Sequence, residues 1–89
     1  MTSADYTPAR AVDVVVVPGP KGARLEDPRG ATIVELNSTA HAIWSLCDGE
    51  TSLGEIAEAI SILTSLKYEA ALAQVIETIA SLTAAGVMS

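Results

Sequence analysis

The sequence predicts an α+β domain in which a three-stranded antiparallel sheet is followed by three helices. The first 36 positions contain short segments typical of strands, separated by turn residues. Three longer segments with apolar residues at helical spacing then follow, as far as residue 85. Strands that precede helices rather than alternate with them are typical of α+β folds. We expect the domain to span residues 11–89, after a flexible and irregular N-terminal arm at residues 1–10.

The first strand is predicted over residues 12–17, VDVVVV, because β-branched residues favour extended backbone. The PGPKG segment that follows should stop it, since proline cannot donate to a strand ladder and glycine allows a turn. A second, shorter strand is expected at residues 23–27. The apolar first strand could also pair between two chains, so a homodimer or a swapped strand is an open alternative.

The third strand is predicted over residues 31–36, after a DPRG segment with the proline and glycine positions of a type I turn. Side chains alternate along a strand, so one face should present Thr32, Val34 and Leu36, and the other Ala31, Ile33 and Glu35. Because residue 36 leads directly into the first helix, we expect its face to point toward the core.

The first helix is predicted over residues 38–47, with Asn37 or Ser38 as its N-cap. Its end is expected at Asp48-Gly49, where glycine can take the left-handed conformation that often follows a helix. The apolar stripe of this helix consists of Ala40, Ile43, Trp44 and Cys47.

The second helix should begin at a capping box formed by Ser52 and Glu55. The third helix is predicted over residues 68–85, with Gly86 as its C-cap. The expected apolar stripes are Leu53, Ile56, Ala57, Ile60 and Leu63 in the second helix, and Leu72, Val75, Ile76, Ile79, Leu82 and Thr83 in the third.

Composition and charge exclude several classes of function. The formal net charge is −6 with only five basic residues, which disfavours nucleic acid as a partner. Cys47 is the only cysteine and His41 the only histidine, so neither a disulfide nor an ordinary zinc site is expected. The sequence contains no secretory h-region and no apolar run of about 20 residues, so we expect a cytoplasmic protein without a membrane span.

No combination of residues in the sequence indicates catalysis, and we expect neither an enzyme nor a cofactor. His41 lies beside an apolar stripe without a nucleophile nearby, and Cys47 lies on that stripe, where it is expected to act as a small buried hydrophobe. The carboxylates are expected on a solvated surface: Asp48, Glu50, Glu55, Glu58, Glu69 and Glu77. An acyl-carrier-like protein modified at Ser52 is an alternative, but the capping box already accounts for that serine and carrier proteins lack such strands.

Two features suggest binding instead. A three-stranded sheet has two edges with unpaired backbone groups, and the third strand has one charge, Glu35, and no proline or lysine to block its edge. A partner peptide could add there as a further strand, unless the arm or tail of the chain covers the edge. Small residues also flank the apolar stripe of the third helix, which leaves room for another segment to pack: Ala71, Gln74, Thr78 and Ala85.

With these elements in this order, the chain resembles the PqqD-like family. The similarity rests on Leu36-Asn37, Ile43-Trp44, Asp48-Gly49 and Gly86-Val87, together with Ala40, Ile56 and Leu82, and it spans roughly residues 12–88. The founding member serves pyrroloquinoline quinone biosynthesis, and the wider family contains the recognition elements of ribosomally made, modified peptides. The resemblance implies a winged-helix-like fold and a binding role without catalysis.

The resemblance also implies a binding site and partners. The leader segment of a precursor peptide would add along the third strand and pack against the third helix. The partner enzyme would be a modifying enzyme, commonly a radical S-adenosylmethionine enzyme, or a leader peptidase. The implied site residues are Ala31, Thr32, Ile33, Val34, Glu35, Leu36, Ala71, Val75, Thr78, Ile79 and Leu82. A winged-helix DNA-binding regulator is the other alternative, although residues 69–86 contain no lysine or arginine.

Overall fold

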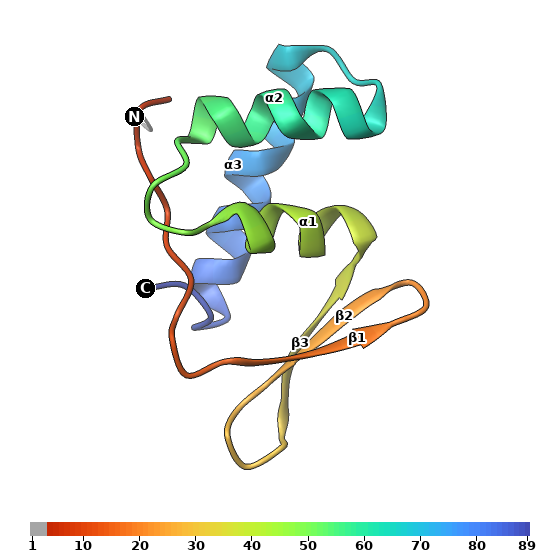
Figure 1. Ribbon diagram of the computed structural model, residues 1–89, viewed down its shortest axis with the longest axis vertical. Helices are drawn as coiled ribbons and strands as arrows, with labels where there is room; N and C mark the ends of the chain where they lie inside the picture. Colours follow the sequence, from red (N-terminus) through yellow and green to blue (C-terminus); the bar gives the residue numbers. More distant parts are fainter. Residues whose placement is uncertain (1–3) are drawn as a thin grey trace.

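Three antiparallel strands and three helices make up the computed structural model, which describes residues 4–89. The strands are β1 (Val15–Gly19), β2 (Gly22–Glu26) and β3 (Thr32–Asn37), and the helices are α1 (Ser38–Leu46), α2 (Leu53–Thr64) and α3 (Tyr68–Ala84). In Figure 1 the sheet lies at the bottom, α1 and α2 lie above it, and α3 runs behind both helices. This order confirms the predicted α+β class.

The strands β1 and β2 form a hairpin with a two-residue connection. Gly19 pairs with Gly22, which leaves Pro20 and Lys21 as the loop. Short connections of this kind fix the register of the two strands, because they leave no slack in the chain. The sheet order is β1-β2-β3, so β2 is central and β1 and β3 are the edges.

The first strand differs from its prediction at both ends. The expected range of 12–17 is wrong: β1 begins at Val15, which pairs with Glu26 at the end of β2, and continues through Pro18. Val12 pairs with no strand residue in the described range 4–89 and is fully exposed. Proline is tolerated in β1 because an edge strand has N–H groups that need no partner in the sheet. The expectation of a homodimer through this strand stays a prediction.

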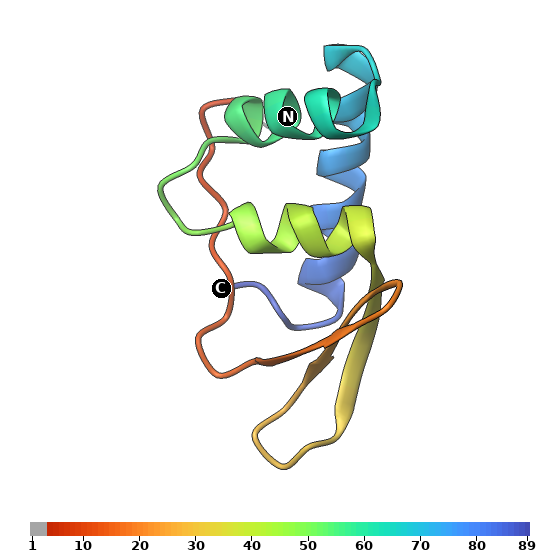
Figure 2. The ribbon, with the colours of Figure 1, turned by 45° about the vertical axis from the view of Figure 1, so that its right-hand side comes forward.

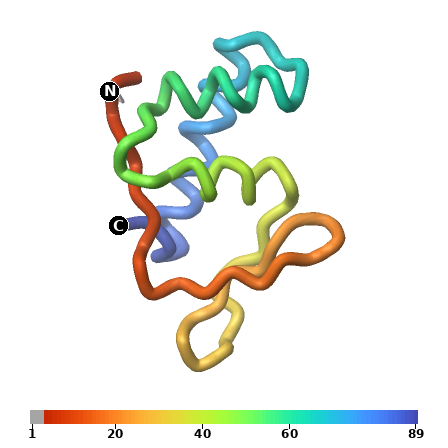
Figure 3. Tube along the Cα trace, in the orientation of Figure 1, coloured from red at the N-terminus to blue at the C-terminus, as the bar shows by residue number. Residues whose placement is uncertain are grey.

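A tight turn joins β2 to β3. The N–H of Gly30 donates to the carbonyl of Asp27 over 3.0 Å, and the Asp27 carboxylate accepts from the N–H groups of Arg29 and Ala31. In Figure 3 this turn projects away from the helices at the bottom of the trace. The predicted ranges of these two strands were each wrong by one residue. β2 begins and ends one residue before the predicted range 23–27, and β3 begins and ends one residue after the predicted range 31–36.

The pairing of β2 with β3 contains an irregularity. Val34 pairs with Leu25 and Thr32 with Glu26, so Ile33 is an extra residue on β3 without a partner. This is the arrangement of a β-bulge, which bends and twists the strand that contains it. The regular part of β3 is therefore the segment after Ile33. The predicted inner face is correct for Leu36, which is buried, and Val34, which is half-buried, whereas Thr32 is exposed.

Asn37 is the N-cap of α1, which decides between the two predicted candidates. Its side-chain oxygen accepts from the N–H of Ala40 over 2.8 Å. The helix ends at Leu46 with Cys47 as C-cap. Gly49 has the expected left-handed conformation, with φ of +82°, but it lies beyond the cap, in the loop to α2.

The predicted capping box of α2 is present. The N–H of Glu55 donates to Ser52 Oγ over 3.2 Å, and the N–H of Ser52 donates to Glu55 Oε1 over 3.0 Å. These two bonds satisfy backbone donors that a helix start leaves free.

The end of α3 forms a Schellman motif. Its C-cap is Ala85, so the prediction of Gly86 as C-cap was wrong by one position; Gly86 follows with φ of +79°. The N–H of Val87 donates to Leu82 and that of Gly86 to Thr83. This pattern of two bonds lets the chain reverse direction. The motif sends Val87 back beneath α1.

The core has two parts. One part lies between the three helices and contains Ile43, Cys47, Leu53, Ile56, Ile60, Ala71, Val75 and Ile79. The other joins the sheet to α1, α3 and the C-terminal segment and contains Leu25, Leu36, Trp44, Leu82 and Val87. The indole N–H of Trp44 donates to the carbonyl of Val87 over 3.2 Å, so the one tryptophan keeps its polar atom satisfied.

Two residues of the predicted helical stripes lie outside the core. Leu63 in α2 is 65% exposed, and Thr83 in α3 is exposed. The two helices are bent by 113° relative to each other, so the last turn of α2 extends beyond the region that α3 covers. Within residues 4–89, no single helix is long and apolar enough to cross a membrane; α2 and α3 pass such a test only as this bent pair.

Residues 4–10 belong to the predicted N-terminal arm, whose residues 1–3 lie outside the described part of the chain, and together with Ala11 they form one continuous segment. The segment contains no helix or long strand, but its backbone is bonded to the rest of the molecule. The carbonyls of Ala4, Tyr6 and Pro8 accept from N–H groups of residues 54, 53 and 49. The N–H groups of Arg10 and Ala11 donate to Cys47 and Val87. In Figure 2 this segment runs along the side opposite to β3.

Candidate functional site

The outer edge of β3 is open along the described part of the chain. β3 pairs with β2 on one side, and no other strand of residues 4–89 pairs with it. The N-terminal segment and the C-terminal residues form bridges elsewhere, Ala9 with Asp48 and Arg10 with Met88. The alternative in which the chain covers its own edge is therefore not seen for residues 4–89. An open edge presents backbone donors and acceptors to a partner strand.

A groove of 480 Å³ lies between this edge and α3, and we call it the β3–α3 groove. It exists because β3 leads directly into α1 at Asn37, so that α3 passes beside the strand rather than across it (Figure 2). The lining residues are Val34, Glu35, Leu36, Asn37, Ala40, Gln74, Glu77, Thr78, Ser81 and Leu82.

The structure divides the predicted site residues into three groups. Five of them line the β3–α3 groove: Val34, Glu35, Leu36, Thr78 and Leu82. Three others, Ala71, Val75 and Ile79, are at most 8% exposed and pack in the core between the helices, so they do not line the groove. The remaining three lie at or before the start of β3, outside the groove, and are exposed: Ala31, Thr32 and Ile33.

Five groove residues were absent from the predicted set. Three of them are polar residues of α3, Gln74, Glu77 and Ser81, and the others are Asn37 and Ala40 at the start of α1. Apolar spacing selected the core face of α3, whereas the groove uses the adjacent face. The residues one helical turn from Thr78 could have indicated that face, because positions 74, 81 and 82 lie beside it on a helix.

The groove combines an apolar floor with acidic residues. Val34, Leu36, Ala40 and Leu82 supply the apolar surface. Glu35 and Glu77 are exposed carboxylates among the lining residues, which include no lysine, arginine or histidine. Asn37 already uses its side-chain oxygen as the N-cap of α1. Shape and chemistry thus fit an extended apolar segment better than an anion.

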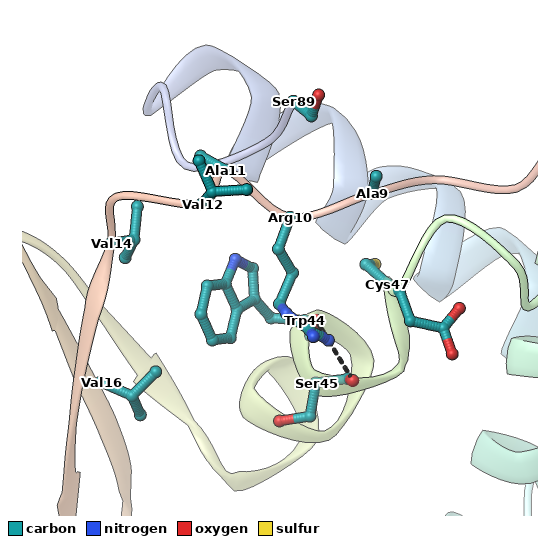
Figure 4. A pocket seen from close by; sticks show the side chains of 11 residues that line it. Ala9, Arg10, Ala11, Val12, Val14, Val16, Trp44, Ser45, Cys47 and Ser89 are labelled. Atoms are coloured by element: carbon teal, nitrogen blue, oxygen red, sulfur yellow. Dashed lines mark hydrogen bonds between the residues drawn. The ribbon is translucent and has the colours of Figure 1, made fainter.

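A second hollow of 740 Å³ lies between the N-terminal segment, β1 and α1 (Figure 4). Arg10 extends into it, lies 5.4 Å from the centre of the Trp44 ring, and donates from Nη1 to the carbonyls of Trp44 and Ser45. The guanidinium thus occupies the C-terminal end of α1, where a cation is favourable. Because these contacts already use the charge of Arg10, the hollow is a structural feature of the helix end.

The residues whose side chains could react, Cys47 and Ser52, are engaged in contacts that stabilise the fold. Burial is the main cause that raises the pKa of the Cys47 thiol, to about 11, although the nearby Arg10 charge lowers it, and the sulfur donates to the carbonyl of Ile43. Such a thiol is a poor nucleophile at neutral pH. Ser52 is engaged in its capping box. Among residues 4–89, no three His, Cys, Asp or Glu side chains are grouped to hold a metal ion.

Fold and site together define a small α+β domain with an open edge strand beside a helix groove. The family model of coenzyme PQQ synthesis protein D (PqqD) matches residues 24–88. The match covers most of the chain, so this protein belongs to the PqqD family, which confirms the resemblance found in the sequence. That family consists of non-catalytic accessory proteins of PQQ biosynthesis that work with a biosynthetic enzyme.

No curated protein and no solved structure gives a significant match to the chain. The N-terminal segment at residues 4–11 and all of β1 precede the part that the family model matches.

Proposed function

We propose that this protein binds the leader segment of a ribosomally synthesised precursor peptide and presents it to an enzyme. The leader adds as a strand along β3 and packs against α3 in the β3–α3 groove. The enzyme is a modifying enzyme, such as a radical S-adenosylmethionine enzyme, or a leader peptidase. In this proposal the protein acts in the cytoplasm, has no catalytic role and needs no cofactor of its own.

The open edge of β3 beside the groove is the observation on which this proposal rests. Unpaired strand edges are usually blocked by lysine, proline or a covering segment, and β3 has none of these along residues 34–37. A strand added there would place alternate side chains toward the groove, where Leu36 and Leu82 offer apolar contacts. Backbone pairing would give affinity, and the groove would give specificity.

Rough energetics are compatible with this mode of binding. The regular segment Val34–Asn37 could form about two to four backbone hydrogen bonds, each worth about 1 kcal/mol net. Two leader side chains buried in the groove would add about 1.5–3 kcal/mol each. After the costs of association and ordering, a micromolar affinity is expected, or about −8 kcal/mol.

The two alternative functions lack a supporting observation. A DNA-binding regulator needs a basic recognition helix, but α3 contains no lysine or arginine and borders an acidic groove. A gel-shift assay at physiological salt would test this alternative. A carrier protein needs a free serine, and phosphopantetheinyl transferase treatment followed by intact mass measurement would reveal a gain at Ser52.

Proline substitution tests strand addition. Successive N–H groups of an edge strand point alternately toward β2 and toward solvent, so Val34→Pro and Glu35→Pro each remove one of the two kinds. We expect the variant that loses the outward N–H to stay folded by circular dichroism. It should bind a synthetic peptide, taken from a short precursor reading frame next to the gene of this protein, at least tenfold more weakly. If both variants are folded and bind this peptide like the unmodified protein in calorimetry, strand addition at β3 is wrong.

A bulky side chain in the groove tests the second part of the proposal. Ser81 is exposed and lines the groove, so Ser81→Trp should fill it without disturbing the core and should abolish peptide binding. Ile62→Trp places the same side chain at an exposed position of α2, outside the residues that line the groove, and serves as the matched control. Equal affinities of the two variants would contradict packing against α3.

A further inference from the structure

We propose that the β3–α3 groove selects peptides that carry lysine or arginine next to apolar residues, with Glu77 as the selecting side chain. This inference rests on the proposed function, because it names the chemistry of the peptide for the same groove. It concerns residues that the family assignment does not specify.

Glu77 is the determinant of this selection. It lies on α3 as an exposed groove residue, and the neighbouring positions one turn away on this helix are uncharged: Ala73, Gln74, Ala80 and Ser81. Within residues 4–89, Glu77 takes part in no ion pair, so its carboxylate has no cationic partner there. A carboxylate in this position is free to pair with a cation that a ligand brings.

Glu35 is on the strand side of the groove, but its side chain lies on the face of β3 opposite to Val34 and Leu36, the face that it shares with Arg24. Arg24 is its partner in the β2–β3 register, but Arg24 directs Nε to the carboxylate of Glu26 over 2.7 Å. One arginine therefore faces two carboxylates on this part of the sheet. Glu35 and Glu77 give the residues of the groove a net negative charge. No lysine, arginine or histidine among the lining residues offsets it.

The arrangement of charges matches a strand with a particular pattern. A peptide strand beside β3 would present alternate side chains to the apolar floor formed by Val34, Leu36 and Leu82. Long basic side chains can lie along an apolar surface and place their charge at its rim, where Glu77 lies on α3. The net charge of −6 would also attract basic peptides and repel acidic ones.

Selection from a random library tests this inference without knowledge of the natural leader. The full chain is immobilised and exposed to displayed random 15-residue peptides, and peptides that Ser81→Trp no longer binds are counted as groove ligands. We expect these to be enriched in lysine and arginine, flanked by apolar residues. One selected peptide is then synthesised with a fluorescent label for titration.

Charge substitution then identifies the selecting residue. Glu77→Gln should raise the Kd of the selected peptide about two- to fivefold, the range for an exposed ion pair, and should weaken its salt dependence. Glu58→Gln removes an equal charge from an exposed site on α2 and should leave the Kd unchanged. Glu77→Lys should reverse the preference. This variant should bind a peptide in which glutamate replaces the basic residue with a lower Kd than it binds the selected peptide.

The outcomes separate this inference from the proposed function. If no library peptide binds in a manner sensitive to Ser81→Trp, the proposed function is overturned and this inference with it. If groove ligands are found but lack basic residues, or if Glu77→Gln and Glu58→Gln affect the Kd equally, selection by charge is overturned and peptide binding stands. Enrichment of basic residues together with reversal by Glu77→Lys supports both.

Discussion

Gly22 begins β2 with a backbone φ of +152°, and its α-carbon faces the carbonyl of Leu36. A β-carbon at this position would lie 1.9 Å from that oxygen, far inside van der Waals contact. The neighbouring atoms belong to the backbone of β3, which leads into α1, so they cannot move independently. A single hydrogen atom in place of a methyl group thus allows the sheet and the first helix to meet.

Gly22→Ala should destabilise the protein by about 3 kcal/mol or more, because conformational strain and overpacking add together. Gly30→Ala is the matched control: its φ is +88°, but no atom lies within 4 Å of its added carbon, so only strain of about 1 kcal/mol is expected. Urea unfolding followed by circular dichroism measures both. Similar losses in the two variants would contradict the role of close contact at Gly22.

Asp48 is the other residue whose chemistry can be tested directly. Its carboxylate accepts hydrogen bonds from the N–H groups of Glu50 and Thr51 and from the Thr51 hydroxyl. The two backbone bonds are the main reason that the pKa of Asp48 lies below its usual value. The ionised form is therefore favoured in the folded state, and the loop before α2 depends on that charge.

This lowered pKa has a defined effect on stability. The contribution of Asp48 is fully present above about pH 4, the usual pKa of the unfolded chain, and is lost as the pH falls through the lower folded value. Asp48→Asn should therefore be less stable than the unmodified protein at pH 7, and the difference should shrink below pH 4. Urea unfolding at pH 7, 5 and 3 measures this. A difference that is constant with pH would contradict the assignment.

At the scale of elements, α1 ends without a basic residue in its last turn, and the N-terminal segment supplies the missing charge. Arg10 reaches the carbonyls of Trp44 and Ser45 from a distant part of the sequence. Arg10→Met should cost about 1 kcal/mol, since a charged donor at a helix end is lost while much of the aliphatic packing is kept.

The control for this prediction is Arg29→Met, which removes an equal charge from an exposed turn. Within residues 4–89, Arg29 forms a hydrogen bond through its backbone N–H and none through its side chain, so thermal unfolding should change little. If both variants lose the same stability, general charge rather than the end of α1 is responsible.

Sequence patterns predicted most elements correctly where local chemistry determines them. Caps at Asn37 and Ser52 identify the starts of α1 and α2 because a side chain satisfies backbone donors within three residues. The run at residues 12–17 offered no such reference: four consecutive valines have no period, and only the pairing of Val15 with Glu26 determines where β1 begins. Local rules therefore place helix starts better than strand limits.

The candidate site was predicted in part for the same reason. Leu36 and Val34 follow from strand alternation, and both line the groove. On α3, however, periodicity identifies apolar faces without saying which element each face meets. Val75 is buried in the core, whereas Glu77 and Ser81 line the groove. The direction in which α3 passes the sheet depends on contacts between distant residues, which periodicity along the helix does not reveal.

At the scale of the whole molecule, the two ends of the chain close the structure together. The C-terminal Val87 is fully buried, accepts from the N–H of Ala11 and the indole of Trp44, and donates to Leu82. The N–H of Ser89 donates to Ala9. Sheet, helices and both terminal segments therefore meet at a single point.

Removal of residues 87–89 should destabilise the protein by about 3–5 kcal/mol, since one buried valine and several hydrogen bonds are lost. Val87→Ala keeps the backbone bonds and should cost about 1–2 kcal/mol. Urea unfolding compares the two variants. Equal losses would indicate that the side chain alone matters, contrary to a closure through backbone bonds.

The position of the one tryptophan has a practical consequence for the study of peptide binding. Trp44 is 5% exposed and packs in the same cluster as Leu36 and Leu82, whose side chains also line the β3–α3 groove. Indole emission depends on the polarity and rigidity of its surroundings. The protein thus contains an intrinsic optical probe one layer of side chains behind the groove, which can follow the titration of any ligand that lacks tryptophan.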